Sequence, residues 1–532
     1  MKASDYIVEL LEKLGVSHIF GIPGVGCGHF LDSVKGSNIK CHIDYHEQAA
    51  AFAACAYAQA KYDVGVAFST AGPGATNLLT GIVNAYSDSI PTVFIVGNKD
   101  LSELKRDRNI RFKASQEVDM VSICKPVTKW SYQIKEPSMV KESIEKAFYV
   151  AKEGRPGPVV LDIPTDIQRA EINPALLHGY SAFKKAVDEE NINFLVKKIC
   201  GSKRTLFLLG NGLRQTDTGR ALLDLCKQKS IPVVLTRGCT EYDNGEYENV
   251  IGVIGVDGDV LANKAVQECD MLVIFGARLT AKQIGKIREN FAANAKIIRI
   301  DADTEELGMG LRDEKRICEN LRDFVPRLIE RMSSKEVPMT GWWRKYIDES
   351  EEKPDENKKY GEQLMRAFTK SIPEQCNIAI DIGSHYIWFS KVRELKARQR
   401  VFQSLGQASM GYGLPAAIGA FYALNQPVVS INGDGGILMN LQELQFLERE
   451  QLPITVVVFN NHCYGAIMEF QRKIFDGNFM GTTEDTGYKS ADYEGIARAF
   501  HMEYQMVSGE DDMRKIQFAK EKPKMVEIVV EG

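Results

Sequence analysis

Short runs of β-branched and aliphatic residues alternate with longer stretches of helical spacing over almost the whole chain. This alternation is typical of parallel sheets that carry helices on both faces. At about 100 to 200 residues per domain, a chain of 532 residues holds about three such domains. We therefore predict an α/β fold built from three doubly wound parallel-sheet domains.

The strand-like runs fall into three series, which two aperiodic stretches separate. Residues 168–192 mix Pro, Gly, His and charged residues, and residues 333–362 are highly charged. No repeat is visible by identity, although the first and third domains could share an architecture. The predicted domains are 1–170, 190–335 and 360–532. The expected helices include 4–14 and the alanine-rich 47–62, and the expected strands are HIFGIP, CHIDY, VGVAFST, TVFIVG, VVLDIP, TLFLLGNG, PVVLTRG, MLVIFGAR, KIIRIDAD, NIAIDIG, VFQSL, PVVSINGDGG, ITVVVFNN and MVEIVV.

Composition argues against several classes of partner. The chain has 66 Lys+Arg against 71 Asp+Glu, a formal charge of -5, and no basic block, so neither a nucleic acid nor a membrane is an expected partner. Its eleven cysteines include no C-x-x-C pair, which indicates free thiols in a reducing compartment. No run approaches the roughly 18 apolar residues of a membrane span, and charged residues interrupt the N-terminus. We expect a cytoplasmic protein that acts on a small molecule.

The stretch VVSINGDGG ends a predicted strand in a glycine-rich turn around Asp434. The glycines Gly433, Gly435 and Gly436 would let backbone N–H groups approach phosphate oxygens, and a following helix would add partial positive charge. A lone carboxylate beside phosphates would repel them, so Asp434 is expected to hold a hard cation such as Mg²⁺. The pattern predicts a diphosphate cradle with a bound cation.

The next predicted strand, ITVVVFNN, ends at Asn460 and Asn461. The carboxyl ends of successive parallel strands lie at one edge of the sheet, so an amide oxygen should lie beside Asp434. Alone, GDGG could be a tight turn and NN a helix cap. Their combination, with Asn461 27 residues after Asp434, favours the diphosphate and cation site.

The spacing from Gly433-Asp434-Gly435 to Asn461 resembles the motif of the thiamine-diphosphate (ThDP) enzymes. This resemblance implies ThDP and Mg²⁺ as cofactors. It also implies that the metal ligands are Asp434, Asn461 and the main-chain carbonyl of Cys463. Around them, Gly436, Tyr464 and Gly465 are expected to contact the cofactor.

Further motifs extend the resemblance over nearly the whole chain. The segments IFGIPG, YHEQAAAFAACAYA, GPGATN, GRPGPVVLDIP and QASMGYGLPAAIGA are similar to the acetolactate synthase branch of the ThDP family. The resemblance implies that Met410 wedges between the two rings of the cofactor and that the backbone near Ala408 bonds its exocyclic amine. Gly383, Ser384 and His385 match the loop that contacts the diphosphate, although Ser384 replaces the usual Gln.

Glu47 begins the predicted helix 47–62, directly after the strand CHIDY. A Glu in the first turn of a helix usually makes only a favourable interaction with the helix dipole. The resemblance instead implies that Glu47 is the activating carboxylate, bonded to N1′ of the aminopyrimidine across a subunit interface. The apolar residues of the helix would strengthen that coupling. His46 could relay a proton, but a local hydrogen bond is the simpler interpretation.

Two more segments of the first domain match positions near the reacting centre in the family. They are Gln116, in KASQEVD, and the glycine loop Gly24-Val25-Gly26, which could equally be a turn. The resemblance also implies a homodimer or homotetramer whose active sites lie at the dimer interface.

Three departures from acetolactate synthases concern the acceptor side of the reaction. Phe470 stands where those enzymes have a Trp, and Lys282, in GARLTAK, stands where they have an Arg that grips the acceptor carboxylate. A Lys keeps the charge but loses the planar bidentate grip. The sequence stops at MVEIVVEG, without the tail that closes over the site in those enzymes. We expect Phe470, Lys282 and Met468 to line the acceptor pocket.

The middle domain could hold FAD, since Arg278 and the strand-end glycines Gly210 and Gly212 are compatible with a dinucleotide. However, LGNGLRQ lacks the third glycine of the dinucleotide fingerprint. A plain turn between strand and helix is the better interpretation, and FAD is a weak expectation.

The leading hypothesis is a ThDP- and Mg²⁺-dependent enzyme that decarboxylates a 2-keto acid, first of all pyruvate, and joins the acyl unit to a carbonyl acceptor. Acetolactate is the default product. Transfer to a larger ketone or aldehyde, such as a sugar, and simple decarboxylation stay open as alternatives. A cofactor-binding scaffold without activity is a hypothesis of another class, and the retention of Glu47, Met410, Asp434 and Asn461 argues against it.

Overall fold

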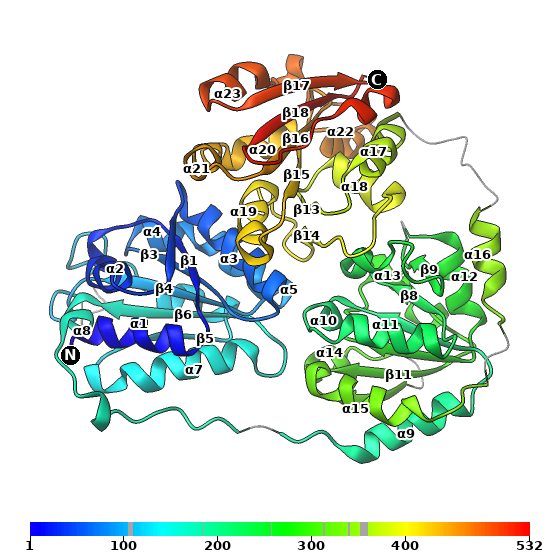
Figure 1. The fold of residues 1–532 in the computed structure, drawn as a ribbon, viewed down its shortest axis with the longest axis horizontal. Helices are drawn as coiled ribbons and strands as arrows, with labels where there is room; N and C mark the ends of the chain where they lie inside the picture. The colour runs from blue at the N-terminus through cyan, green and yellow to red at the C-terminus, as the bar shows by residue number, and fades with distance from the viewer. Residues whose placement is uncertain are drawn as a thin grey trace. The chain divides into compact units, whose positions relative to one another are not determined.

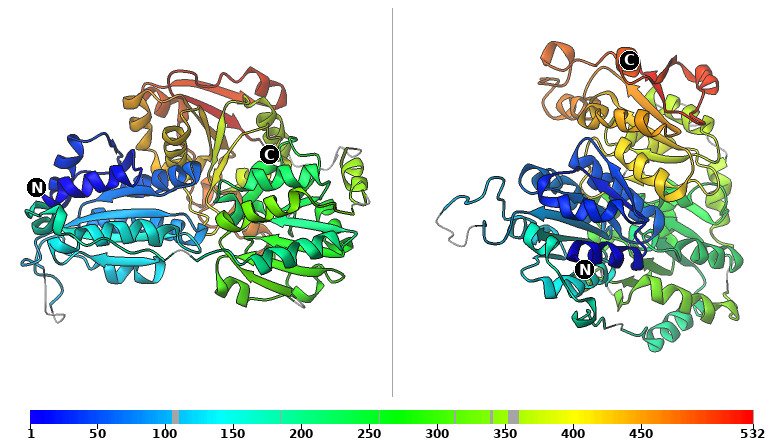
Figure 2. Two further views of the ribbon diagram at one scale, coloured as in Figure 1. Left: turned by 60° about the horizontal axis from the view of Figure 1, so that its bottom comes forward. Right: turned by 60° about the vertical axis from the view of Figure 1, so that its left-hand side comes forward.

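The computed structural model describes residues 1–104, 110–183, 185–256, 258–311, 314–338, 341–351 and 360–531, with the main chain only at 350 and 351. Within them the chain forms three six-stranded sheets whose paired strands all run parallel. Figure 1 shows the sheets in blue to cyan, in green and in yellow to red, with helices packed against them, and Figure 2 adds two views. The predicted α/β class is confirmed. The predicted linker 333–362 lies partly outside the described residues, and so does Gly532.

The first sheet has the strand order β2-β1-β3-β4-β6-β5. Its order changes direction between β1 and β3, and in open parallel sheets ligands bind at the carboxyl ends of the strands beside such a switch. The first sheet is therefore expected to present a site between the loops that follow β1 and β3. Its strands are β1 (His18–Gly21), β2 (Lys40–Ile43), β3 (Gly65–Ser69), β4 (Thr92–Asn98), β5 (Trp130–Gln133) and β6 (Pro158–Pro164).

The third sheet repeats the order of the first, as β14-β13-β15-β16-β18-β17. This confirms the shared architecture that the sequence left open. The switch lies between β13 and β15, so the loops after these two strands should meet. The strands are β13 (Asn377–Ile380), β14 (Val401–Gln403), β15 (Val428–Gly433), β16 (Ile454–Asn460), β17 (Glu503–Ser508) and β18 (Lys524–Val529).

The middle sheet has a different order, β12-β11-β10-β7-β8-β9. This is the order of dinucleotide-binding folds, with the switch between β7 and β10. The strands are β7 (Thr205–Leu209), β8 (Val233–Leu235), β9 (Val250–Val253), β10 (Met271–Phe275), β11 (Lys296–Asp301) and β12 (Glu314–Cys318).

The helices connect successive strands and cover the faces of the sheets (Figure 1). In the segment of the first sheet they are α1 (Ala3–Lys13), α2 (Gly28–Lys35), α3 (Glu47–Lys61), α4 (Pro73–Asn77), α5 (Leu79–Asp88), α6 (Met120–Cys124), α7 (Val140–Lys152) and α8 (Thr165–Arg169). In that of the middle sheet they are α9 (Glu189–Cys200), α10 (Asn211–Arg214), α11 (Gly219–Gln228), α12 (Val260–Glu268), α13 (Ala281–Ile284), α14 (Thr304–Gly308), α15 (Leu321–Ser333) and α16 (Arg344–Glu351). In that of the third sheet they are α17 (Tyr360–Ser371), α18 (Ser384–Val392), α19 (Gly413–Leu424), α20 (Asp434–Ile437), α21 (Glu443–Glu450), α22 (Gly465–Ile474) and α23 (Tyr493–Ala499).

The alanine-rich helix α3 packs at close range against α19. A methyl group on Gly419 of α19 would lie 2.0 Å from the carbonyl oxygen of Ala53 in α3, so the two backbones meet without a side chain between them. Both helices belong to one hydrophobic core that includes residues of the first and third sheets. Small residues on α3 therefore join two of the three predicted domains.

The chain divides into two compact units. One comprises residues 1–183, 371–386 and 400–532 and holds the first and third sheets, and the other comprises residues 184–370 and 387–399 and holds the middle sheet. The eleven cysteines are all free thiols. In the part of the chain that the structure describes, no helix combines the length and the apolar character needed to cross a bilayer.

Candidate functional site

The GDGG turn lies at the carboxyl end of β15, as predicted. Gly433 is the last residue of the strand and the N-cap of α20, and Asp434 is the first residue of that helix. The helix predicted after the turn is present as α20, which spans only Asp434–Ile437. The geometry of the turn therefore depends on its glycines more than on a helix dipole.

Three oxygen atoms converge beside this turn. The side-chain oxygen of Asn461 lies 3.3 Å from Oδ1 of Asp434 and 3.0 Å from the carbonyl oxygen of Cys463. Without a cation this amide would turn its NH₂ group toward the two acceptors, whereas a cation is satisfied by all three oxygens. Hard cations such as Mg²⁺ take oxygen ligands of these types. The donor set therefore fits the predicted metal.

Asp434 itself is buried, and its Oδ2 has no hydrogen-bond partner within the described residues. Burial raises the pKa of the Asp434 carboxyl to about 6. A buried carboxylate oxygen without a partner is costly unless a ligand or ion satisfies it. In the described ranges, no group of three or more His, Cys, Asp or Glu side chains could hold a metal, so the expected site depends on an amide and a main-chain oxygen beside one carboxylate.

The loop after β13 meets the GDGG turn at the switch of the third sheet. A methyl group on Gly433 would lie 3.0 Å from the ring of His385, and one on Gly383 would lie 2.8 Å from the same ring. Burial lowers the pKa of His385 to about 4, so the ring is neutral at ordinary pH, and its Nε2 has no partner among the described residues. This neutral ring adjoins the turn where a diphosphate is expected.

The start of α22 completes this group. A methyl group on Gly465 would lie 2.4 Å from Nδ2 of Asn461 and 2.7 Å from Oγ of Ser384. The ring of Tyr464 covers Gly435, since a methyl group there would lie 2.1 Å from Cε1 of that ring. We call residues 383–385, 433–436, 461 and 463–465 the Asp434 cluster. The structure thus brings together the diphosphate and metal residues that the sequence predicted.

Asp381 connects the Asp434 cluster with the loop that carries Ala408 and Met410. Its buried carboxylate accepts the backbone N–H groups of Gly411 at 3.0 Å and Tyr412 at 3.1 Å, and it packs against Gly436. Burial raises the pKa of Asp381 to about 6. Asn440 holds the same loop from the other side by donating to the carbonyl of Gly411 at 2.7 Å. Sequence reasoning missed both residues, and only the place of Asp381 directly after a strand hinted at the first.

Ala408 has φ 53°, in the left-handed region that non-glycine residues seldom adopt. Met410 is half-buried. A methyl group added to the adjoining Gly411 would lie 2.6 Å from Cβ of Met439. Backbone strain of this kind persists only where surrounding residues hold the loop in one conformation. The roles of Ala408 and Met410 toward the cofactor stay predictions.

Glu47 is the first residue of α3 and is buried. Its Oε2 accepts a hydrogen bond of 3.0 Å from Nδ2 of Asn77, which the sequence analysis missed. A methyl group on Gly74 would lie 3.0 Å from the other carboxylate oxygen. His46 is the N-cap, and its Nδ1 accepts from the N–H of Gln48 at 3.1 Å. The local interpretation of His46 is confirmed.

The predicted glycine loop of the first domain adjoins the same place. A methyl group on Gly24 would lie 2.5 Å from Cβ of Thr70, and the N–H of Gly26 donates to Oγ1 of Thr70 at 3.1 Å. Thr70 also packs against Gly74, which contacts Glu47. Val25 is exposed over 77% of its surface. The loop after β1 and the loop after β3 therefore meet at the switch of the first sheet.

Gln116 lies on the edge of this group. It has φ 66°, and a methyl group on Gly72 would lie 2.8 Å from its Cβ. Gly72 precedes α4, the helix that carries Asn77. We call residues 24–26, 47, 70, 74, 77 and 116 the Glu47 cluster. It contains all five residues that the sequence assigned to catalysis.

The predicted acceptor residues are divided between the two compact units. Phe470 is half-exposed on α22 and its ring contacts that of Phe475 at a centroid distance of 5.6 Å, while Met468 lies half-buried on the same helix. Lys282 lies on α13 of the other compact unit, where its carbonyl accepts the N–H of Val256 at 2.8 Å. The acceptor pocket stays a prediction.

The glycine turn of the middle sheet gives little support for a dinucleotide. The N–H of Gly212 donates to the carbonyl of Gly276 at 2.8 Å, and the N–H of Gly210 donates to the carbonyl of Phe275 at 2.8 Å. A methyl group on Gly210 would lie 2.3 Å from the Gly276 carbonyl oxygen. These amides are used within the fold, so this turn does not present them to a phosphate.

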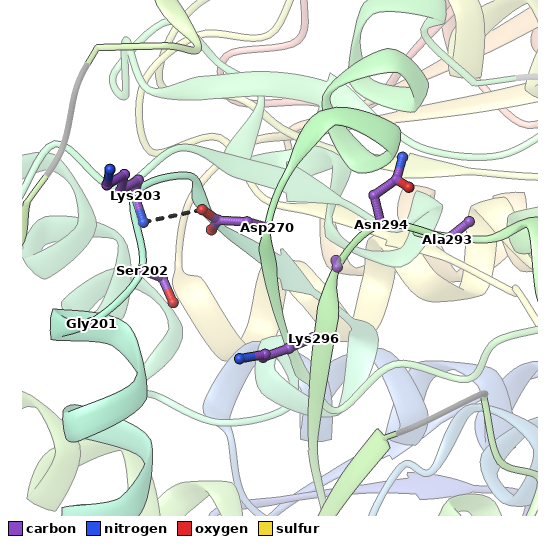
Figure 3. A pocket seen from close by; sticks show the side chains of 8 residues that line it. Gly201, Ser202, Lys203, Asp270, Ala293, Asn294 and Lys296 are labelled. Carbon is purple, nitrogen blue, oxygen red and sulfur yellow. Dashed lines mark hydrogen bonds between the residues drawn. The ribbon is translucent and has the colours of Figure 1, made fainter.

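A depression of about 620 Å³ lies at the opposite, amino-terminal edge of the middle sheet. Figure 3 shows Asp270 at its centre, bonded to the backbone N–H of Lys203 at 3.2 Å, and Asp270 also accepts from Arg204 at 3.0 Å. Its acidic group is therefore engaged in holding the main chain. None of the predicted site residues lines this depression.

Comparison with known proteins identifies the family to which the chain belongs. Three family models match: the N-terminal TPP binding domain of thiamine pyrophosphate enzymes at residues 1–123, their central domain at 192–328, and their C-terminal TPP binding domain at 381–530. Thiamine pyrophosphate is the same compound as ThDP. The Asp434 cluster lies within the C-terminal match and the Glu47 cluster within the N-terminal one.

Similar curated proteins are acetolactate synthases. A probable acetolactate synthase large subunit of Methanocaldococcus jannaschii is 32% identical over 100% of this chain and 92% of its own length. Acetolactate synthase 2, chloroplastic, of Zea mays is 33% identical over 94% of this chain and 80% of its own. The acetolactate synthase large subunit of Pyropia yezoensis is 30% identical over 96% and 88%. The chain therefore belongs to the thiamine pyrophosphate enzyme family and resembles its acetolactate synthase large subunits over nearly its whole length.

Proposed function

We propose that this chain is a ThDP- and Mg²⁺-dependent enzyme that decarboxylates pyruvate and joins the acyl unit to the carbonyl group of a second 2-keto acid, forming acetolactate. The observation that carries the proposal is the convergence of three oxygens from Asp434, Asn461 and Cys463 beside a glycine-lined strand edge. The reaction type rests on the acetolactate synthases to which the chain is similar.

Each cluster has a defined task in this proposal. ThDP, when bound, supplies the carbanion chemistry that lets carbon dioxide leave from a 2-keto acid. Asp434, Asn461 and the Cys463 carbonyl would hold Mg²⁺ beside the bound cofactor, and the residues at Gly383–His385 line the same edge of the sheet. Glu47 would hold a proton at N1′ of the aminopyrimidine, and its burial would keep water from competing for that proton.

Product analysis tests the proposal. The purified protein, loaded with ThDP and Mg²⁺ and given pyruvate alone, should form acetolactate and release carbon dioxide. Acetaldehyde as the main product would instead select simple decarboxylation. A product formed only after an aldehyde or larger ketone is added would select another acceptor. Binding of ThDP without turnover of any keto acid would favour the scaffold hypothesis.

The proposal includes a homodimer or homotetramer in which the Glu47 cluster of one subunit serves the Asp434 cluster of another. Mixing the two inactive variants Glu47→Gln and Asp434→Asn tests this assembly. If subunits exchange and sites are shared, the mixture regains part of the wild-type activity, because some sites then carry neither substitution. A mixture that stays inactive after proven exchange would place both clusters in one subunit.

FAD is not part of the proposal, because the N–H groups of Gly210 and Gly212 are bonded within the fold. The visible absorption spectrum of the purified protein tests this. A flavin spectrum that persists after dialysis would require another binding mode in the middle domain. The cytoplasmic location stays a prediction from the sequence.

A further inference from the structure

The loop at residues 404–411, between β14 and α19, is held by a helix from the segment of the first sheet. The two carboxylate oxygens of Asp88, the last residue of α5, accept the backbone N–H of Leu405 at 2.8 Å and that of Gly406 at 2.6 Å. A methyl group on Gly406 would lie 2.8 Å from Cβ of Ser87. The backbone of the loop therefore lies directly on the last turn of α5.

A second contact lies one turn earlier on the same helix. Oδ1 of Asn84 accepts from Oγ of Ser404 at 2.6 Å, and the same Oγ accepts from the N–H of Ser409 at 3.0 Å. Asn84 and Asp88 are four residues apart, so they lie on one face of α5. All four side chains are buried. Ser404 thus ties both ends of the loop to each other and to the helix.

The place of Asp88 in its own helix is unfavourable. The helix dipole opposes a negative charge at the carboxyl end, and the last turn of α5 contains no basic residue. Burial of a carboxylate adds a further cost unless hydrogen bonds satisfy it. The bonds to the two loop amides are charge-assisted and are therefore among the stronger ones. A residue that costs its own helix and binds a distant loop is explained by the loop.

The tip of the loop has little support of its own. Residues 406–408 are exposed, and Ala408 has the left-handed φ of 53°. The end of the loop is fixed by Asp381 and Asn440, through the N–H and the carbonyl of the same residue. Asp88 fixes its start. The strained conformation between these anchors therefore depends on α5 at one side.

Helix α5 is a rigid support for this purpose. A methyl group on its Gly81 would lie 2.2 Å from Cβ of Ala51 in α3, so the two helices meet without free space between them. Parts of a site are held most precisely by packed elements of this kind.

We propose that Asp88 and Asn84 are positioning residues that fix the 404–411 loop in the conformation that receives ThDP. This inference rests on the proposed function, in which Ala408 and Met410 contact the cofactor. Asp88 and Asn84 act through the loop and do not touch the cofactor themselves. A displacement of about 1 Å in a site can cost about a hundredfold in rate, so a loosened loop should be measurable.

The main test replaces Asp88. Asp88→Asn keeps the size of the side chain but brings an NH₂ group to one of the two loop amides, and Asp88→Ala removes both acceptors. We expect the Kd of ThDP, measured by titration calorimetry at saturating Mg²⁺, to rise about tenfold in Asp88→Asn, because the loop must then be ordered on binding. It should rise further in Asp88→Ala. In the loaded enzyme kcat should fall by about tenfold, with little change in the KM for pyruvate.

Asp270→Asn is the matched control. Asp270 also accepts the N–H groups of two consecutive residues, Lys203 and Arg204, but in the other compact unit. Its replacement should leave the Kd of ThDP and kcat unchanged. Variants of Asp88 that unfold at a lower temperature but keep the wild-type Kd and kcat would show a merely structural contact and would overturn the proposal.

Ser404→Ala tests the Asn84 contact by a smaller change. It removes the hydroxyl that donates to Asn84 and accepts from the Ser409 amide. The Kd of ThDP should rise in the same direction as in Asp88→Asn. Should Asp88→Ala not fold, Asp88→Asn and Ser404→Ala still decide, and a wild-type Kd in both would refute the proposal.

Hydrogen exchange in the full chain without cofactor gives a readout that needs no turnover. The amides of Leu405, Gly406 and Ser409 should be protected in the wild type and in Asp270→Asn, although the tip of the loop is exposed. They should exchange faster in Asp88→Ala, and equal protection there would overturn the proposal. A wild type that binds ThDP but turns over no keto acid would refute the proposed function alone. Wild-type turnover in a variant with an unprotected loop would refute this inference alone.

Discussion

The proposed chemistry at residue scale depends on a carboxylate with few partners. Glu47 accepts one side-chain hydrogen bond, from Asn77, and otherwise adjoins glycine and alanine. Glu47→Gln keeps this bond and the size of the side chain but cannot exchange a proton. We predict that kcat falls by about 10² to 10⁴, the range for loss of a general acid or base. Steady-state kinetics with pyruvate at saturating ThDP and Mg²⁺ measures the change.

The effect of Glu47→Gln should be confined to catalysis. The midpoint of thermal unfolding and the affinity for ThDP should stay near the wild-type values, because the hydrogen bond to Asn77 survives. Glu9→Gln, at a partly exposed position of α1 whose carboxylate pairs with Lys13, is the control and should leave kcat unchanged. Near wild-type turnover in Glu47→Gln would contradict the assignment.

At residue scale, the sequence anticipates which residues meet where chemistry requires a rare pattern. Asp434 and Asn461 could be predicted because an acid beside phosphates makes sense only with a cation. Asp381 and Asn77 could not, because each acts through a partner 30 positions away, and only the place of Asp381 directly after a strand hinted at a role. Their roles depend on the packed fold, which local spacing does not encode.

At the scale of elements, the close contact between α3 and α19 allows a direct test of packing. A methyl group on Gly419 would lie 2.0 Å from the carbonyl oxygen of Ala53, so Gly419→Ala forces the helices apart. We predict a loss of about 1 to 3 kcal/mol in the free energy of unfolding, which exceeds the usual gain from replacing a helical glycine. Chemical denaturation measures it.

Gly28→Ala is the matched control for this contact. Gly28 begins α2 in the same compact unit, and a methyl group there would meet nothing within 4 Å. This variant should be neutral or slightly stabilised, because alanine restricts the unfolded chain. Equal stability of the Gly419→Ala and Gly28→Ala proteins would show that α3 and α19 can separate without cost.

The carboxyl group of Asp162 on β6 gives the first sheet a pH-dependent stability. It accepts from Asn98 on β4 at 2.8 Å and from Gln133 on β5 at 3.1 Å, and burial raises its pKa to about 7. Between about pH 4 and pH 7 the folded state holds a proton that the unfolded chain has released, so stability falls as the pH rises through this window. Asp162→Asn should remove this fall, on the order of 2 to 4 kcal/mol, because its side chain cannot ionise.

Denaturation curves at pH 4, 5, 6 and 7 check the Asp162 prediction. The wild type and the variant should be closest in stability at the lowest pH and should diverge in favour of the variant as the pH rises. Parallel curves over the whole window would contradict the raised pKa.

Most strands could be predicted, and those that were missed share a physical reason. The missed strands are β5, β9, β12 and β17, and each lies at an edge of its sheet. An edge strand has a neighbour on one side only, so it needs no long apolar run. In β12 and β17 most residues are exposed or half-buried, and β9 is a short run with a glycine. Central strands such as β4 and β16 are buried throughout, which gives them the apolar pattern that a reader of the sequence recognises.

At the scale of the molecule, the first and third sheets repeat one strand order and each places its cluster at the switch. The middle sheet has another order and lies in the other compact unit. Both proposed parts of the ThDP site therefore belong to one unit of the chain, residues 1–183, 371–386 and 400–532. Cofactor binding should act on the stability of that unit.

Chains with several compact units commonly unfold in more than one step, and a ligand that binds only the folded state stabilises the unit that holds its site. We predict that ThDP and Mg²⁺ together stabilise the unit with the two clusters by about 2.7 kcal/mol at a ligand concentration a hundredfold above Kd. The midpoint temperature of its calorimetric transition should rise accordingly. The transition of the unit with residues 184–370 should not move. Asp434→Asn should abolish the shift, because the cation then loses its charged ligand. ThDP without a divalent cation should produce only a small shift. A shift confined to the middle unit would place the cofactor elsewhere and refute the assignment of both clusters.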